Sequence, residues 1–219
     1  KHLHRVIVSS AAYRRTSAAK DSENWLAVDP ENKLLWRMNA GRMEAEVIRD
    51  SLLYAAGQLD RTMGGQPREN SESLTTYRRS LYYSYYPELG GQSPLGELFD
   101  GPNALECYRR TRTVIPQQAL ALTNSDLVHT MSTEIVKRWE DQQGASGGTN
   151  ETEQFVIAMF GTILSRMPSS SERTLCLDAL DRHRALLTQT IDDEATITRK
   201  TRESLVRALF SHNDFVAIR

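Results

Sequence analysis

The sequence predicts a mainly α-helical fold, an irregular helical bundle with one short aromatic strand or hairpin. Three observations support this prediction. Apolar residues recur every three or four positions along most of the chain, as in helices that bury one face. Helix-start signals precede several of these segments, for example Ser169 followed by Glu172. Only the segment 78–86 alternates aromatic residues as a strand does.

The first half should form several short helices. Asp29 is a preferred N-cap and Pro30 suits the first helical position, so a helix is predicted from about residue 29 to 38. An apolar stripe at helical spacing predicts another from about residue 41 to 59. Further helices should begin near Pro94 and Pro116.

Helical spacing is already present at the amino end, in Leu3, Val6 and Ile7, with no capping residue before it. This predicts a helix there and suggests that the chain begins inside a longer protein. A secretion signal would then lie upstream of Lys1.

The segment 78–86 is the strand candidate, because its tyrosines alternate and aromatic residues favour a pleated surface. Alternation would place two tyrosines on each side of the strand. Tyr83 and Tyr85 are therefore candidate binding residues, with rings that could stack on a sugar or a peptide. The alternative interpretation is that they simply pack in the core.

A run of glycine and serine divides the chain, since such a segment is too polar and flexible to pack. We expect an Arg-rich helical region at 1–143, a linker-like loop at 144–150 and a C-terminal helical subdomain at 151–219 that packs on the first. Within the last region, the segment 155–164 is apolar nearly all round and should be central.

Composition excludes several classes of protein. The 219 residues carry 27 Lys and Arg against 28 Asp and Glu, a formal net charge of −1. This balance gives no broad field for nucleic acid, and no stretch approaches the roughly 20 apolar residues that span a bilayer. A chain of this length buries enough surface to fold without a metal or cofactor, so no cofactor is expected.

The two cysteines indicate no metal site. Cys107 and Cys176 are 69 positions apart and neither belongs to a CxxC pair, which argues against a zinc ribbon or a covalent haem. They could form a disulfide in an exported protein, or each could be an ordinary buried residue. His183 shares a predicted helix face with Cys176, but seven residues span about 10.5 Å, too far for both to ligate one ion.

Arg42, Glu46 and Arg49 form the first candidate binding cluster. On one helix they would lie within about 60° of one another, beside the apolar stripe. One interpretation is a ladder of exposed ion pairs worth about 0.2–0.5 kcal/mol each. The other leaves one arginine free to bind a carboxylate, sulfate or phosphate in its planar fork.

A second cluster contains Arg109, Arg110 and Arg112, with Gln117 at the start of the following helix. Helix amino ends favour anions, so this is the stronger candidate for an anion site. Asp100 lies close enough in sequence to neutralise these arginines, which is the competing interpretation.

Several runs match a known pattern, in order, across residues 1 to 126: Leu3-His4-Arg5, Ser9 to Arg15, Asp29 to Asn32, Leu35-Trp36-Arg37, Arg42 to Asp50, Arg79 to Tyr82 and Pro116 to Leu122. Together they resemble the planctomycete-type secreted domain of unknown function, which usually follows a partner domain and sometimes a cytochrome c-like module. The resemblance implies an extracellular or periplasmic location and a larger parent protein. It implies no reaction, so no catalytic role is carried over to any residue.

The leading hypothesis is therefore an interaction module that binds an anionic or carbohydrate partner, such as an anionic polysaccharide, or a neighbouring domain of the parent chain. One alternative is a hydrolase-type enzyme in which two of Glu44, Glu46 and Asp100 converge beside an arginine in a cleft. The resemblance suggests another, an accessory domain of an extracellular cytochrome c-containing electron-transfer protein.

Overall fold

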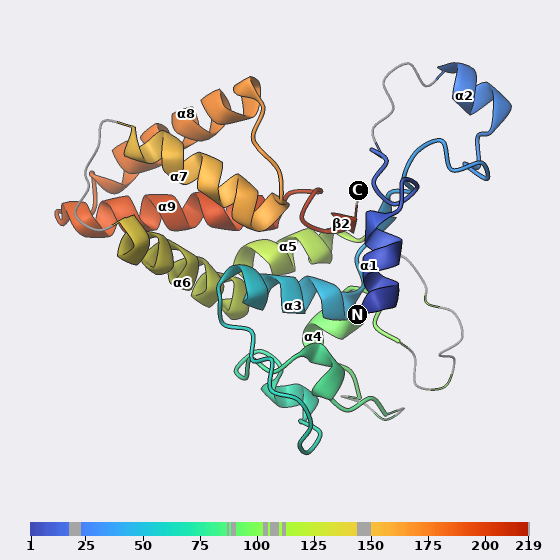
Figure 1. The fold of residues 1–219 in the computed structure, drawn as a ribbon. Helices are drawn as coiled ribbons and strands as arrows, with labels where there is room; N and C mark the ends of the chain where they lie inside the picture. The colour runs from blue at the N-terminus through green and yellow to red at the C-terminus, as the bar shows by residue number, and fades with distance from the viewer. Residues whose placement is uncertain are drawn as a thin grey trace. The chain divides into compact units, whose positions relative to one another are not determined.

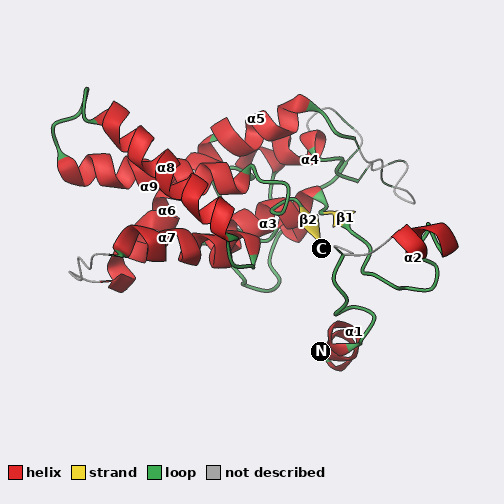
Figure 2. Ribbon diagram, turned by 90° about the horizontal axis from the view of Figure 1, so that it is seen from above, coloured by secondary structure: helices red, strands yellow, loops and turns green. Residues whose placement is uncertain are grey.

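A computed structural model of the chain describes residues 1–17, 23–86, 88, 91–102, 105, 110, 113–143 and 150–218. Over these residues the fold is mainly α-helical, as predicted, and two very short strands form its sheet (Figure 2). The chain divides into two compact units, Lys1–Met43 with Val216–Arg219, and Glu44–Phe215.

The first unit contains the helices α1 (His2–Ser9) and α2 (Glu23–Val28). Its sheet pairs β1 (Gly41–Arg42) antiparallel with β2 (Ala217–Ile218). The helix predicted at the amino end is confirmed as α1.

The helix predicted from 29 to 38 is wrong, because this segment forms a series of turns. The Asp29 carboxylate accepts the backbone N–H groups of Lys33 and Leu34, at 2.9 and 2.7 Å. Asn32 and Leu35 adopt the left-handed conformation, with φ of 57° and 54°. A side chain that bonds nearby backbone competes with the helix, and left-handed residues interrupt it.

The second unit contains the remaining helices (Figure 1). They are α3 (Ala45–Ala55), α4 (Pro94–Leu98), α5 (Pro116–Asn124), α6 (Asp126–Gln143), α7 (Glu151–Met159), α8 (Ser170–Leu187) and α9 (Glu194–Phe210), with single 3-10 turns at Asn70–Glu72 (η1) and Ser80–Tyr82 (η2). The helix α7 continues into a π-helical turn, η3 (Phe160–Leu164).

Local capping explains where several of these helices begin. The Ser93 side chain accepts the N–H of Gly96 and opens α4, with Pro94 at the first helical position. Ser169 and Glu172 form the predicted capping box at the start of α8. Asp193 caps α9 by accepting the N–H of Thr196 at 3.0 Å.

The core lies where α6 and α9 pack side by side, with α5, α7 and α8 against them and α3 packed on α6 (Figure 1). Phe155 and Phe210 are among its largest fully buried side chains, and each such residue contributes about 1.5–3 kcal/mol by leaving water. The prediction that the segment 155–164 is central is confirmed, since most of its apolar side chains are buried.

Helices from both sides of the predicted 144–150 loop belong to one compact unit. Residues 144–149 lie outside the described part of the chain. The helix α6 precedes this segment and α9 lies further along the chain after it, and the two pack against each other within Glu44–Phe215. The boundaries between the compact units fall after Met43 and before Val216.

The predicted aromatic strand is wrong. Residues 80–82 form the turn η2, and Tyr83 makes only an isolated bridge with Arg68. The turn forms because the Asp50 carboxylate on α3 accepts both the backbone N–H and the hydroxyl of Ser80, at 2.8 and 2.7 Å. Contacts with a distant helix therefore outweigh the local preference of the tyrosines for a strand.

Candidate anion-binding site

Arg49, a predicted site residue, is a structural anchor. It is 2% exposed and its guanidinium stacks 4.7 Å from the centre of the Tyr83 ring. All five of its N–H donors are used, on the carbonyl oxygens of Ser73, Thr76 and Arg78 and the hydroxyls of Ser80 and Tyr83, at 2.6 to 3.3 Å. Arg49 thus fastens the segment 73–83 to α3 and has no donor left for a ligand.

Glu46 and Arg110 form a closed ion pair. Both terminal nitrogens of Arg110 donate to the two carboxylate oxygens of Glu46, each at 2.7 Å. Burial alone would raise the pKa of Glu46, but hydrogen bonds, chiefly from Arg110, outweigh it and the pKa is lowered. Burial and the Glu46 charge raise the pKa of Tyr85 to about 12, and its hydroxyl lies 3.4 Å from Glu46.

This pair bears on the hydrolase alternative. Glu44 and Glu46 do line one cavity, of about 520 Å³. However, Arg110 keeps Glu46 ionised, so this carboxylate cannot supply a proton near neutral pH. Asp100 is not among the residues lining that cavity, and it accepts two hydrogen bonds from Thr113, at 2.7 and 2.9 Å.

Of the other predicted arginines and glutamine, the structure describes Arg42 and Gln117. Arg42 lies in β1, ahead of α3, so the prediction that it shares a helix flank with Glu46 is wrong. Gln117 is exposed on α5. Arg109 and Arg112, like Cys107, lie outside the described residues. Cys176 is a free, half-buried thiol whose pKa is raised by burial.

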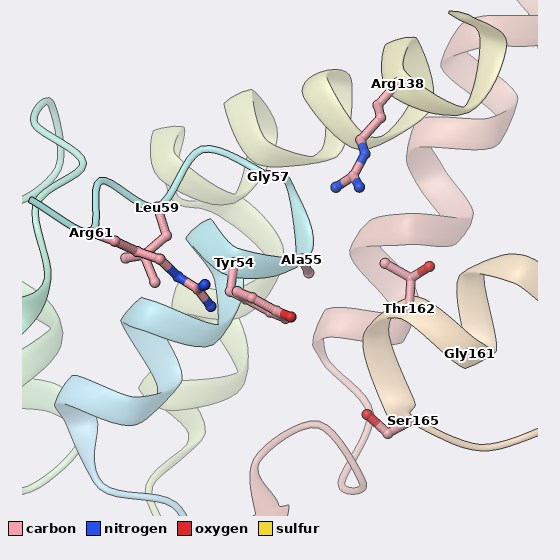
Figure 3. A pocket seen from close by; sticks show the side chains of 9 residues that line it. All are labelled: Tyr54, Ala55, Gly57, Leu59, Arg61, Arg138, Gly161, Thr162 and Ser165. Carbon is pink, nitrogen blue, oxygen red and sulfur yellow. The ribbon is translucent and has the colours of Figure 1, made fainter. Parts of the chain in front are cut away.

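Two arginines that the sequence did not single out line a cavity of about 490 Å³ in the second unit (Figure 3). Arg61 follows α3 in a loop, and Arg138 lies on α6. Figure 3 shows the Arg138 side chain extending from its helix toward the space between α3 and η3, with Arg61 beside Tyr54. We call this space the Arg61–Arg138 cavity; it is lined by Tyr54, Ala55, Gly57, Leu59, Arg61, Arg138, Gly161, Thr162 and Ser165.

Neither guanidinium is neutralised within the described part of the chain. Arg138 makes no hydrogen bond, ion pair or ring contact with any described residue. Arg61 has no described carboxylate partner, and its guanidinium lies 5.2 Å from the centre of the Tyr54 ring. None of the described residues that line the cavity is acidic. Two unpaired positive charges at one cavity favour an anionic ligand.

Hydroxyl groups surround these charges. Tyr54, Thr162 and Ser165 reach the cavity from α3 and from the π-helical turn with the residue after it (Figure 3). None of the three side chains hydrogen-bonds to a described residue. π-helical turns occur frequently at functional sites, and here the turn places Thr162 at the cavity.

The loop that carries Arg61 is held at several points. Asp60 accepts the N–H of Thr62 at 2.8 Å, and the hydrogen bonds from Thr62 lower the pKa of this aspartate. Arg78 donates to the carbonyl oxygens of Thr62 and Gly64, at 3.0 and 2.8 Å, while stacking 4.2 Å from the centre of the Tyr82 ring. These contacts preorganise the backbone on both sides of Arg61.

Negative charge lies in the adjacent hollow. Glu134 and Asp141, on α6, line a separate cavity that shares Gly57 and Arg138 with the first. Glu134 already accepts a hydrogen bond from Gln58, at 2.8 Å. Of the two cavities that meet at Gly57, only the Arg61–Arg138 cavity is therefore lined by positive charges without acidic residues among those described.

No group of three or more His, Cys, Asp and Glu side chains is arranged to hold a metal ion among the described residues. No described helix has both the length and the apolar character needed to cross a membrane.

Fold and site together define a mainly α-helical domain with a cationic cavity beside α3 and α6. A family model described as "PSD1: Protein of unknown function (DUF1553)" matches residues 1–180, and the chain belongs to this family. Comparisons with curated proteins and with solved structures gave no significant match.

Proposed function

We propose that this domain is a binding module for an acidic saccharide, held in the Arg61–Arg138 cavity. The observation that supports it is the pair of guanidiniums without carboxylate partners among the described residues at a cavity of about 490 Å³. The volume lies within the usual range of about 300–1,000 Å³ for small-molecule sites. As in the sequence-based hypothesis, the module would belong to an exported multidomain protein.

The lining favours an acidic sugar over a simple inorganic anion. Guanidinium groups bind a carboxylate through paired, charge-assisted hydrogen bonds. The hydroxyls of Tyr54, Thr162 and Ser165 can both donate and accept, which matches the hydroxyl groups of a sugar ring. Tyr54 is 61% exposed and offers apolar surface beside them.

The test is titration calorimetry of the full chain with glucuronate, trigalacturonate, glucose and sulfate. We expect glucuronate and trigalacturonate to bind, glucose to bind far more weakly, and affinity to fall with added salt. Changing Arg61 or Arg138 to alanine should weaken glucuronate binding about tenfold or more, because a hydrogen bond to a charged group contributes about 1.5–3 kcal/mol.

Lys137→Ala is the matched control, since it removes the same charge one residue away, at the adjacent hollow. Its glucuronate affinity should equal that of the unmodified protein. Equal binding of glucose and glucuronate, or unchanged affinity when both arginines are replaced, would contradict the proposal. Tight sulfate binding without glucuronate binding would show a plain anion site instead.

A further inference from the structure

The helix α8 carries apolar side chains on two opposite faces. Its inner face packs on α7 and α9, and Leu180 on that face is 5% exposed. On the outer face, Leu175 and Leu186 are 68% and 62% exposed. Figure 1 shows α8 at the edge of the group that it forms with α7 and α9. A surface helix usually has polar residues opposite its buried stripe, so a second apolar face favours a second packing partner.

The outer face of α8 is one straight row of side chains. At 100° per residue, four exposed residues fall within about 60° of one another: Leu175, Ala179, Arg182 and Leu186. The row is about 16.5 Å long and has a leucine at each end. A single exposed leucine needs no explanation, but two leucines that frame an alanine on one line match the contact surface of a second helix.

This row is symmetric about the point between residues 180 and 181. Leu175 and Leu186 lie equally far from that point, in opposite directions, and Ala179 and Arg182 do so as well. In an antiparallel pair of α8 helices with a two-fold axis at that point, each residue faces the one at the same distance on the other side. Each Leu175 then contacts Leu186 of the second copy, and the small Ala179 leaves room for the long side chain of Arg182.

Charge complementarity supports the same arrangement. Within one helix, Arg182 and Asp178 form an i,i+4 pair with 3.8 Å between nitrogen and oxygen, and their side chains are 82% and 58% exposed. In the antiparallel pair, Arg182 lies only one residue, about 1.5 Å along the axis, from the level of Asp178 of the second copy. Two arginines and two aspartates thus meet at the centre with no net charge. A second copy therefore supplies both the apolar ends and the opposite charges that match this face.

We propose that the outer face of α8 is the interface of a homodimer, in which two α8 helices pack antiparallel about a two-fold axis between residues 180 and 181. One helix pair buries less surface than the roughly 1,200 Å² or more of a stable interface, so the dimer is weak, with a Kd of about 10–100 µM. The inference is independent of the proposed function, because none of these residues lines the Arg61–Arg138 cavity.

The first experiment is sedimentation equilibrium of the full chain between about 10 and 500 µM, a range that brackets such a Kd. Leu175→Glu and Leu186→Glu should each weaken association at least about tenfold, since each change puts a charge into both ends of the interface. Leu120→Glu is the matched control, because Leu120 is 58% exposed on α5, and its Kd should equal that of the unmodified protein. Urea unfolding confirms that the variants are folded.

A charge exchange tests the centre of the interface. Asp178→Arg and Arg182→Asp should each weaken association severalfold, because like charges then meet across the two-fold axis. The double variant restores opposite charges and should recover most of the affinity.

Cross-linking tests the register, in a background with Cys107 and Cys176 changed to serine. Leu175→Cys mixed with Leu186→Cys should give a cross-linked dimer under mild oxidation. Each variant alone should not, because the two copies of either residue lie about 16.5 Å apart along the axis.

Three results would overturn the proposal. A chain that is monomeric at every concentration leaves this face without a second copy. A dimer that is unaffected by Leu175→Glu and Leu186→Glu uses another surface. Cross-linking of either cysteine variant alone, as efficient as in the mixture, excludes the antiparallel register.

Discussion

A Cβ atom on Gly57 would lie 2.8 Å from Nη1 of Arg138. Gly57 also has a φ of 73°, a conformation that side chains other than glycine rarely adopt. The turn after α3 thus provides both the change of chain direction and the space through which the Arg138 guanidinium passes. Arg138 keeps its position at the cavity because this residue has no side chain.

The first prediction concerns Gly57→Ala. The backbone conformation should cost about 1–2 kcal/mol of unfolding free energy, and displacement of Arg138 should weaken glucuronate binding. Gly64→Ala is the matched control, with a φ of 76° but open space around its Cβ position. Urea unfolding should show similar losses for both variants, and calorimetry should show the larger loss of glucuronate affinity in Gly57→Ala, because Gly64 affects only the loop through its contact with Arg78. Equal affinities in the two variants would rule out this role for Gly57.

The second prediction concerns Arg78, which holds the loop on either side of Arg61. In Arg78→Ala the loop loses the two hydrogen bonds that its carbonyl oxygens accept from Arg78, and the stack on Tyr82 is lost as well. Glucuronate affinity should fall severalfold, because Arg61 is then no longer preorganised. Arg68→Ala removes an exposed i,i+4 pair with Glu72 and serves as the control. An affinity equal to that of the control would contradict the positioning role.

The third prediction concerns Arg49→Met. This change leaves three carbonyl oxygens without their guanidinium donors in a buried region, and it should lower the unfolding free energy by about 3 kcal/mol or more. Arg49→Lys should recover only part of the loss, since an ammonium has three donors for five acceptors. Arg199→Ala removes a 53% exposed partner of Glu140 and should cost about 0.5 kcal/mol or less. For all three variants, the denaturant concentration at the unfolding midpoint gives the change in unfolding free energy, provided that the slope of this free energy against denaturant concentration is unchanged.

The fourth prediction concerns pH. The hydrogen bonds of Arg166 lower the pKa of Glu172 from 4.5 to about 2. A carboxyl group whose pKa is depressed in the folded state stabilises the protein above its unfolded pKa and loses that contribution as pH falls. The stability difference between the unmodified protein and Glu172→Gln should therefore be constant above about pH 5 and shrink toward pH 2. Urea midpoints across this range test it, and a difference that is unchanged at pH 2.5 would contradict it.

The elements that could be predicted from the sequence are those whose ends are set locally. The proline and capping signals at Pro94, Pro116 and Ser169 lie within one turn of the helices that they open. The all-round apolar pattern of 155–164 likewise reports burial directly. No distant contact was needed to infer these features.

The incorrect predictions share a different cause. Asp29 and Pro30 predicted a helix, but the carboxylate bonded two nearby amides and formed turns instead. The tyrosines of 78–86 predicted a strand, but Arg49 and Asp50, about 30 positions earlier, bind that segment as a turn. In both cases a polar side chain binds backbone groups, at short range for Asp29 and at long range for Arg49 and Asp50, and such contacts leave no periodic pattern to detect.

The candidate site could not be predicted from the sequence either. Arg61 and Arg138 are 77 positions apart, and no sequence pattern links the two. The sequence did indicate that Glu46 and Arg49 lie on one helix, but it could not show that their partners come from the chain itself. A glycine directly after the apolar stripe of α3 was the one local signal near the cavity.

The kind of side chain that is buried in the first unit affects how this unit should unfold. Among its described residues the buried ones are polar, Asp29 and Asn32, whereas every described apolar side chain that is buried lies between Ala45 and Phe215. The heat-capacity increment of unfolding arises from apolar surface that becomes hydrated. A calorimetric scan should therefore record almost all of this increment from Glu44–Phe215, and residues 1–43 should melt gradually with hardly any heat-capacity step.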